Sequence, residues 1–199
     1  IASWWDYGYW ITTLSDRTTL IDNATLIDSR IKDVAKIFLS SPDQGWNLLR
    51  EWNADYVVVF ITLDRLENYS NSGERLYVLG KGGDETKSQW FIRIAGLPIQ
   101  EYLYSDLYTV NNNFLNNTLL GKMIPYSPIA YYDQRNDQSW TEFRPGFIPL
   151  YVEDIKYNSE DGPLKFVYSS PSFNNEKNGS IGVVLVYKIN ENYIPLNLQ

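Results

Sequence analysis

The chain has 199 residues and a formal net charge of −7, and 44% of its residues are hydrophobic. This composition is typical of one globular unit with a sizeable buried core, and it excludes wholesale disorder. The longest apolar stretch, near residues 56–63, is less than half of the ~20 residues that span a bilayer. The acidic balance, without a Lys/Arg cluster, argues against nucleic acid as a partner, because phosphate binding requires a positive surface.

Cysteine and histidine are both absent from the sequence. Without cysteine there is no disulfide framework, no thiolate nucleophile and no cysteine-based zinc site. Without histidine there is no Ser-His-Asp triad and no imidazole base. Because the sequence begins at Ile1 without methionine or a signal peptide, we expect it to be a piece of a longer protein.

The first half of the sequence predicts helices around one strand. Apolar residues between positions 27 and 39 recur at helical spacing and indicate a helix with one buried face. The segment Ser41-Pro42-Asp43-Gln44 is typical of a helix start, with Ser41 as the N-cap residue and Pro42 at the first helical position. The β-branched run Tyr56–Phe60 then predicts a short strand buried on both faces.

Further along, a helix is expected to begin at Asp84 and to end near Gly96. Its inward-facing residues are predicted to be Trp90, Phe91 and Ile94. The apolar pattern of Phe114–Met123 predicts one more helix.

Beyond Pro125 the alternating segments Lys165–Tyr168 and Ile181–Ile189 predict strands. The expected fold class is therefore α+β, with a mainly helical central core around a short buried strand and a β-rich C-terminal part. We place the helix-rich core at residues 1–125 and the β-rich part at residues 126–199, both within the same globular unit.

The most distinctive segment is Trp4-Trp5-Asp6-Tyr7-Gly8. Indole N–H groups are donors only, and an ionised aspartate is an acceptor only. Together, Trp4, Trp5 and Asp6 can hold a hydroxyl group from both sides, and the rings would shield it from water. The alternative is a Trp-rich core segment in which Asp6 caps a helix, Tyr7 is part of the core and Gly8 allows a tight turn.

This segment resembles the Trp-Trp-Asp-Tyr-Gly signature of the catalytic subunit of oligosaccharyltransferase, the membrane enzyme of asparagine-linked glycosylation. The run Asp84-Glu-Thr-Lys87-Ser-Gln-Trp-Phe91 is similar to the second motif of that family, in which a Lys follows the Asp by three residues. The family has Met or Ile where this chain has Phe91. The Lys-containing motif is similar to archaeal and eukaryotic enzymes, and the absence of Cys and His favours an archaeal source.

The resemblance implies transfer of a dolichol-type, lipid-linked oligosaccharide to Asn in an acceptor polypeptide with Asn-X-Thr/Ser. In the family, acidic residues and a Mn²⁺ or Mg²⁺ ion in an N-terminal transmembrane region activate the acceptor. The resemblance therefore implies no catalytic residue and no metal ligand in this chain, which would lie on the extracytoplasmic side of the cell membrane. It assigns the grip on the Thr or Ser hydroxyl to Trp4, Trp5 and Asp6, beside Tyr7 and Gly8. Asp84, Lys87 and Phe91 would line the same pocket.

Two of these residues have a plain structural alternative. Asp84 and Lys87 can form a solvated ion pair at i, i+3, although Lys87 would then oppose the helix dipole in the first turn. Phe91 is expected nearest the Thr methyl group, and the alternative is that it points into the core.

The competing function is a carbohydrate-binding or surface-layer module without a role in transfer, since aromatic faces bind sugar rings. A purely structural domain is the third possibility. The motifs around Asp6 and Lys87 favour the oligosaccharyltransferase over both.

Overall fold

The computed structural model describes residues 1–157, 160–175 and 177–195. Its helices are α1 (Trp5–Ser15), α2 (Asp28–Leu39), α3 (Pro42–Glu51), α4 (Asp84–Ala95), α5 (Ile99–Tyr102), α6 (Asn112–Asn117) and α7 (Leu119–Met123). Its strands are β1 (Tyr56–Tyr69), β2 (Arg75–Leu79), β3 (Tyr126–Asp133), β4 (Gln138–Trp140), β5 (Ile148–Glu153), β6 (Leu164–Ser169) and β7 (Gly179–Ile189).

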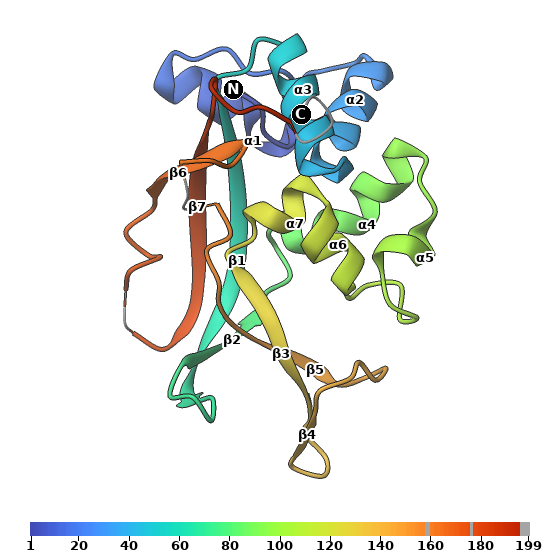
Figure 1. The fold of residues 1–199 in the computed structure, drawn as a ribbon, viewed down its shortest axis with the longest axis vertical. Helices are drawn as coiled ribbons and strands as arrows, with labels where there is room; N and C mark the ends of the chain where they lie inside the picture. Colours follow the sequence, from blue (N-terminus) through green and yellow to red (C-terminus); the bar gives the residue numbers. More distant parts are fainter. Residues whose placement is uncertain (158–159, 176, 196–199) are drawn as a thin grey trace.

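The strands form one sheet in the order β4-β3-β5-β2-β1-β7-β6, and neighbouring strands run antiparallel. Helices and strands are thus both major components, which confirms the α+β class. Strands from residues 1–125 occupy the middle of the sheet, and strands from residues 126–199 continue it on both sides. Figure 1 shows the helices gathered around the upper part of β1 and β7, while β3, β4 and β5 extend beyond them.

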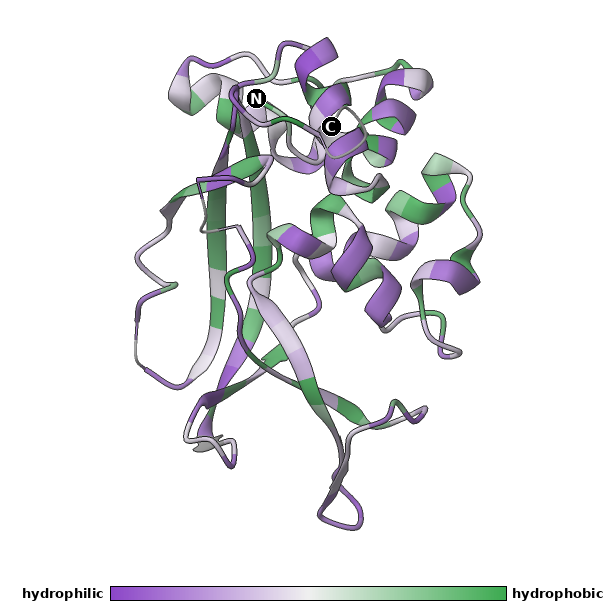
Figure 2. Ribbon diagram, in the orientation of Figure 1, coloured by the Kyte–Doolittle hydropathy of each residue, from purple (hydrophilic) through white to green (hydrophobic). Residues whose placement is uncertain are grey.

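The prediction of a short strand buried on both faces is wrong for Tyr56–Phe60. This segment begins the 14-residue strand β1, which pairs with β7 from Tyr56 to Arg65. Burial alternates along it, because successive side chains of a strand point to opposite faces. The fully buried apolar residues are Val57, Val59, Ile61 and Leu63. The apolar residues of β1 and β7 appear as green stretches along these two strands in Figure 2.

The helices predicted for residues 27–39, after Ser41 and from Asp84 are confirmed as α2, α3 and α4. Ser41 Oγ accepts a hydrogen bond from the Gln44 amide at 3.4 Å, as the N-cap prediction requires. α4 ends at Gly96, whose left-handed conformation (φ 76°) favours glycine.

The helix predicted for Phe114–Met123 is broken into α6 and α7. Thr118 has an extended backbone between them, and its Oγ1 accepts a hydrogen bond from the Gly121 amide at 3.0 Å, so that it caps α7. The predicted apolar side is nevertheless buried throughout the two short helices. Its members are Phe114, Leu115, Leu119, Leu120 and Met123.

One large core joins the helical layer to the face of the sheet. α2 lies at its centre and packs against α3, α4 and α7, while α4 also contacts β1. A second, smaller cluster of Leu76, Leu150 and Val152 involves β2 and β5. Within the described ranges, no helix has the length and apolar character needed to cross a membrane.

Candidate functional site

The Trp4–Gly8 segment forms the start of α1, with Trp4 as the N-cap residue. Trp4 is only 2% exposed, and its ring packs on Phe91 with the centroids 3.8 Å apart. Trp5, the next residue, turns outward and is 37% exposed. The two indoles therefore have different environments, one set into the core and one at the surface.

Gly8 lies inside α1, where the helix approaches the backbone of residues 21–22. A Cβ atom at this position would overlap the carbonyl oxygen of Ile21 and lie 2.7 Å from Cα of Asp22. The tight turn expected at Gly8 is absent, because this residue is helical. The glycine is needed for close approach between two backbone segments instead.

Lys87 on α4 reaches across to α1. Its Nζ atom lies 2.6 Å from Asp6 Oδ2 and donates a hydrogen bond to the Tyr7 hydroxyl at 2.7 Å. The same ammonium group lies 4.6 Å from the centre of the Tyr7 ring. The alternative of an i, i+3 ion pair with Asp84 is therefore not what forms, since the ion-pair partner of Lys87 is Asp6, 81 residues away in sequence.

Asp84 connects the Tyr7 hydroxyl to the backbone of β1. The Tyr7 hydroxyl donates to Asp84 Oδ1 at 3.0 Å, and the Phe60 amide of β1 donates to Oδ2 at 3.0 Å. Desolvation raises the pKa of Asp84 to about 6, although the Phe60 amide, Lys87 and Tyr7 all favour its charged form. Burial, followed by the nearby Asp84, also raises the pKa of Tyr7, which remains a neutral phenol. We call Asp6, Tyr7, Asp84 and Lys87 the Lys87 cluster.

A groove of about 370 Å³ lies between α1 and α4, and we call it the α1–α4 groove. It is lined by Trp4, Trp5, Asp6, Lys87, Trp90 and Ile94. Neither indole N–H group has a hydrogen-bond partner in the described part of the chain, and the same holds for Asp6 Oδ1. The residues that line the groove thus carry two unpaired donors and one unpaired carboxylate oxygen beside a fixed ammonium group.

Two predicted pocket residues lie elsewhere. Phe91 is fully buried and packs against Trp4 and Phe38, so the ring supports the groove from behind. This corrects its expected placement in the pocket. Asp84 is 1% exposed and lies beneath Tyr7. In a helix with ~100° per residue, Phe91 is rotated by about 40° from Lys87, toward the core side.

Trp90 and Ile94 were expected to point inward, but they line the α1–α4 groove. Trp90 is 53% exposed and carries the Arg93 guanidinium group 5.6 Å above its ring. Lys87, Trp90 and Ile94 are spaced i, i+3, i+7, which places them on one face of a helix. This spacing is the sequence signal that could have identified them.

The residues present do not form a cage for a divalent cation. In the described part of the chain, no three Asp, Glu, His or Cys side chains converge. The nearest carboxylates to the groove, Asp6 and Asp84, are held by Lys87 and Tyr7 rather than facing one another.

Part of the chain matches a known protein family. Residues 1–67, which contain the Trp4–Gly8 segment and most of β1, match the STT3/PglB/AglB core domain.

Curated relatives then define the family. The chain is 34% identical over 134 residues to the dolichyl-diphosphooligosaccharide–protein glycosyltransferase subunit STT3 of Saccharomyces cerevisiae, covering 62% of this chain and 17% of the relative. It is 31% identical over 137 residues to the subunit STT3 of Dictyostelium discoideum (66% and 17%), and 28% identical over 199 residues to the subunit STT3B of Oryza sativa subsp. japonica (95% and 24%). The chain belongs to this family of oligosaccharyltransferase subunits, and it spans less than a quarter of the length of these relatives.

Proposed function

We propose that the chain recognises the acceptor polypeptide of an oligosaccharyltransferase, and that the α1–α4 groove binds the Thr or Ser hydroxyl two residues after the acceptor Asn. The observation that carries the proposal is the set of unpaired polar atoms around one groove. Trp4 and Trp5 offer indole N–H donors, and Asp6 offers a carboxylate oxygen. A hydroxyl is both donor and acceptor, so it satisfies this set completely.

Recognition of this kind supports transfer by positioning. An amide nitrogen is a poor nucleophile, and holding the peptide by a neighbouring residue converts an encounter into an oriented complex. Lys87 fixes one oxygen of Asp6, so the other oxygen is presented in a defined direction. Trp90 and Ile94 add an apolar wall, against which a Thr methyl group gains contact that Ser lacks.

The remaining parts of the activity belong to the whole enzyme. We propose that a transmembrane region holds the dolichol-type, lipid-linked oligosaccharide and a Mn²⁺ or Mg²⁺ ion, and that this chain faces the extracytoplasmic side. We also propose an archaeal type of enzyme, because the Lys-containing second motif is similar to archaeal and eukaryotic enzymes and the absence of Cys and His favours an archaeal source. The 199-residue chain alone is expected to transfer no glycan to a peptide.

A direct test uses the indole resonances of the chain. Addition of an Asn-Ala-Thr peptide should shift the indole N–H signals of Trp4 and Trp5, and an Asn-Ala-Ala peptide should not. Equal shifts with both peptides contradict hydroxyl recognition. Binding of glycans at these indoles, without binding of the Thr peptide, supports the carbohydrate-binding module instead.

A second test measures transfer in the full-length enzyme. Asp6→Ala removes the acceptor for the hydroxyl proton of the peptide, and an unsatisfied buried group costs ~1–3 kcal/mol, so transfer should fall about tenfold. Asp28→Ala is the matched control, because Asp28 is an exposed carboxylate in the first turn of α2. Wild-type turnover of a folded Asp6→Ala enzyme contradicts the assignment.

A further inference from the structure

A second cavity lies on the other side of the first turn of α4, between this turn, the β2–β5 part of the sheet and the loop that follows α5. Its volume is about 390 Å³, within the range of ~300–1,000 Å³ that is usual for small-molecule sites. It shares no lining residue with the α1–α4 groove. We call it the Tyr108 cavity.

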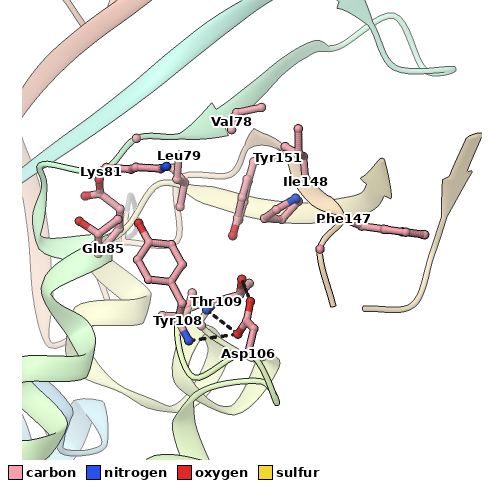
Figure 3. A pocket seen from close by; sticks show the side chains of 15 residues that line it. Val78, Leu79, Lys81, Glu85, Asp106, Tyr108, Thr109, Phe147, Ile148 and Tyr151 are labelled. Atoms are coloured by element: carbon pink, nitrogen blue, oxygen red, sulfur yellow. Dashed lines mark hydrogen bonds between the residues drawn. The ribbon is translucent and has the colours of Figure 1, made fainter. Parts of the chain in front are cut away.

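Aromatic rings form much of its wall. Tyr108 comes from the loop after α5 and Tyr151 from β5, and Figure 3 shows their rings beside each other, with Phe147 farther out. Tyr151 is buried at 2% exposure, whereas Tyr108 is 41% exposed. One ring is therefore fixed by the core and the other is open to a ligand.

Glu85 closes the inner end of the cavity (Figure 3). Its Oε1 atom accepts hydrogen bonds from the Thr62 hydroxyl at 2.9 Å, the Thr62 amide at 3.3 Å and the Gly83 amide at 3.2 Å. Its Oε2 atom is buried and has no partner in the described part of the chain. Buried carboxylate oxygens are normally hydrogen-bonded, so this atom calls for a donor.

The charges around the cavity restrict what can enter it. The Lys81 ammonium extends over the same space and would repel a cation, while Glu85 disfavours an anion. The Asp106 carboxylate already accepts hydrogen bonds within its own loop, from the Tyr108 amide at 3.0 Å and from the Thr109 amide at 2.9 Å. A purely apolar ligand would leave Glu85 Oε2 without a partner. The remaining class is neutral, carries hydroxyl groups and has a flat C–H face for the aromatic wall.

We propose that the Tyr108 cavity binds a neutral saccharide ring, with the ring face on Tyr108 and with hydroxyl groups directed toward Glu85 and Lys81. This site goes beyond the proposed peptide recognition and uses none of its residues. The two sites are nevertheless adjacent, because Asp84 and Glu85 are consecutive residues that face the Lys87 cluster and the Tyr108 cavity respectively.

The test is a titration of the ¹⁵N-labelled 199-residue chain with four soluble trimers. Two are neutral sugars, maltotriose and chitotriose, one is an acidic sugar, trigalacturonate, and one is cationic, trilysine. The proposal expects a neutral sugar to shift the amide signals of residues 80–86 and 106–110 while the indole signals of Trp4 and Trp5 stay in place. It is overturned if neither neutral sugar shifts them, or if trigalacturonate or trilysine binds there more tightly.

Variants complete the test. Tyr108→Ala removes an exposed ring, so the variant should fold, and the affinity for the neutral sugar should fall at least roughly fivefold because a stacking face is lost. Tyr168→Ala is the matched control, since Tyr168 is a 52% exposed tyrosine of β6 outside the cavity. Equal loss of affinity in both variants, or no loss in Tyr108→Ala, overturns the proposal. Failure of the Thr-peptide test at Trp4 and Trp5 would leave these outcomes unaffected, so the two proposals fail separately.

Discussion

Lys87 and Asp6 form an ion pair with a distance of 2.6 Å between Nζ and Oδ2, although they are 81 residues apart in sequence. The pair joins the first turn of α4 to the first turn of α1, and the side chains are 22% and 35% exposed. Because Lys87 also donates to the Tyr7 hydroxyl, it holds the carboxylate and the phenol of one helix at the same time. The orientation of Asp6 in the α1–α4 groove thus depends on a residue of another helix.

Lys87→Met should weaken peptide binding strongly while lowering stability only slightly. A partly exposed ion pair contributes no more than ~1 kcal/mol, so the free energy of unfolding should fall only slightly. The affinity for an Asn-X-Thr peptide should fall on the order of tenfold, since Asp6 loses the group that orients it. Peptide titration and denaturant unfolding of the same variant measure the two quantities.

Lys36→Met is the control for this prediction. Lys36 forms an exposed pair with Asp33 at 4.0 Å on α2, away from the groove. This variant should keep wild-type affinity. If Lys87→Met binds the peptide as tightly as Lys36→Met does, Lys87 does not position Asp6 for recognition.

Substitution of Ile94 should change the choice between Thr and Ser, whereas substitution of Phe91 should change only stability. Ile94 lines the groove, so Ile94→Ala should reduce the preference for Thr over Ser peptides by up to about fourfold, the value of one buried methyl group at ~0.8 kcal/mol. Phe91 is in the core, so Phe91→Ala should leave the Thr/Ser ratio unchanged and lower the free energy of unfolding by ~3–5 kcal/mol. Competition between the two peptides, together with thermal unfolding, distinguishes these roles. A changed Thr/Ser ratio in a folded Phe91→Leu variant would mean that Phe91 contacts the peptide in the groove.

The sequence predicted the elements whose signals are local. Helical spacing identified α2, the Ser41 cap identified the start of α3, and Gly96 identified the end of α4. The length of β1 was missed because the strand continues beyond its apolar run. In the continuation, polar residues such as Asp64 occupy the less buried face of the strand. The break at Thr118 was missed because the apolar pattern runs through it without interruption.

The site was predictable as a set of residues, but not as a set of contacts. The motifs named Asp6, Tyr7, Asp84 and Lys87, yet which carboxylate meets the ammonium depends on how α1 docks on α4. That docking is decided by tertiary packing, including the burial of Trp4 against Phe91. Glu85 was not singled out, since an acidic residue in a first helical turn ordinarily indicates a solvated position that favours the helix dipole.

Gly8→Ala should lower both the stability of the chain and its affinity for the peptide. The added Cβ atom would meet backbone atoms of Ile21 and Asp22, which cannot rotate away as a side chain can. Overpacking of this kind typically costs ~1–3 kcal/mol, and α1 would have to shift to relieve it. Chemical denaturation should show the loss, and peptide affinity should fall with it. Gly73→Ala is not a suitable control, because Gly73 has a positive φ of 85°; Ser15→Ala, an exposed change at the end of α1, serves instead.

Glu85 should make the stability of the chain depend on pH. Desolvation raises its pKa from the ordinary 4.5 to about 7, although hydrogen bonds from Thr62 favour the charged form. Between these two values the folded chain holds a proton that the unfolded chain has released. Unfolding therefore releases a proton, and stability falls as the pH rises through this range, with the penalty fully present above about pH 7.

Glu85→Gln removes this titration while keeping an oxygen that accepts from Thr62. Between pH 4.5 and pH 8 the wild-type chain should therefore lose on the order of 2 kcal/mol more of its free energy of unfolding than the variant does. Asp84, whose pKa is also raised by burial, is present in both chains and contributes to both slopes. Glu101→Gln, a change at an exposed carboxylate of α5, should retain the wild-type slope. Denaturant unfolding at a series of pH values measures these slopes. Parallel slopes for the wild type and Glu85→Gln would mean that the Glu85 carboxylate is solvated in the folded chain.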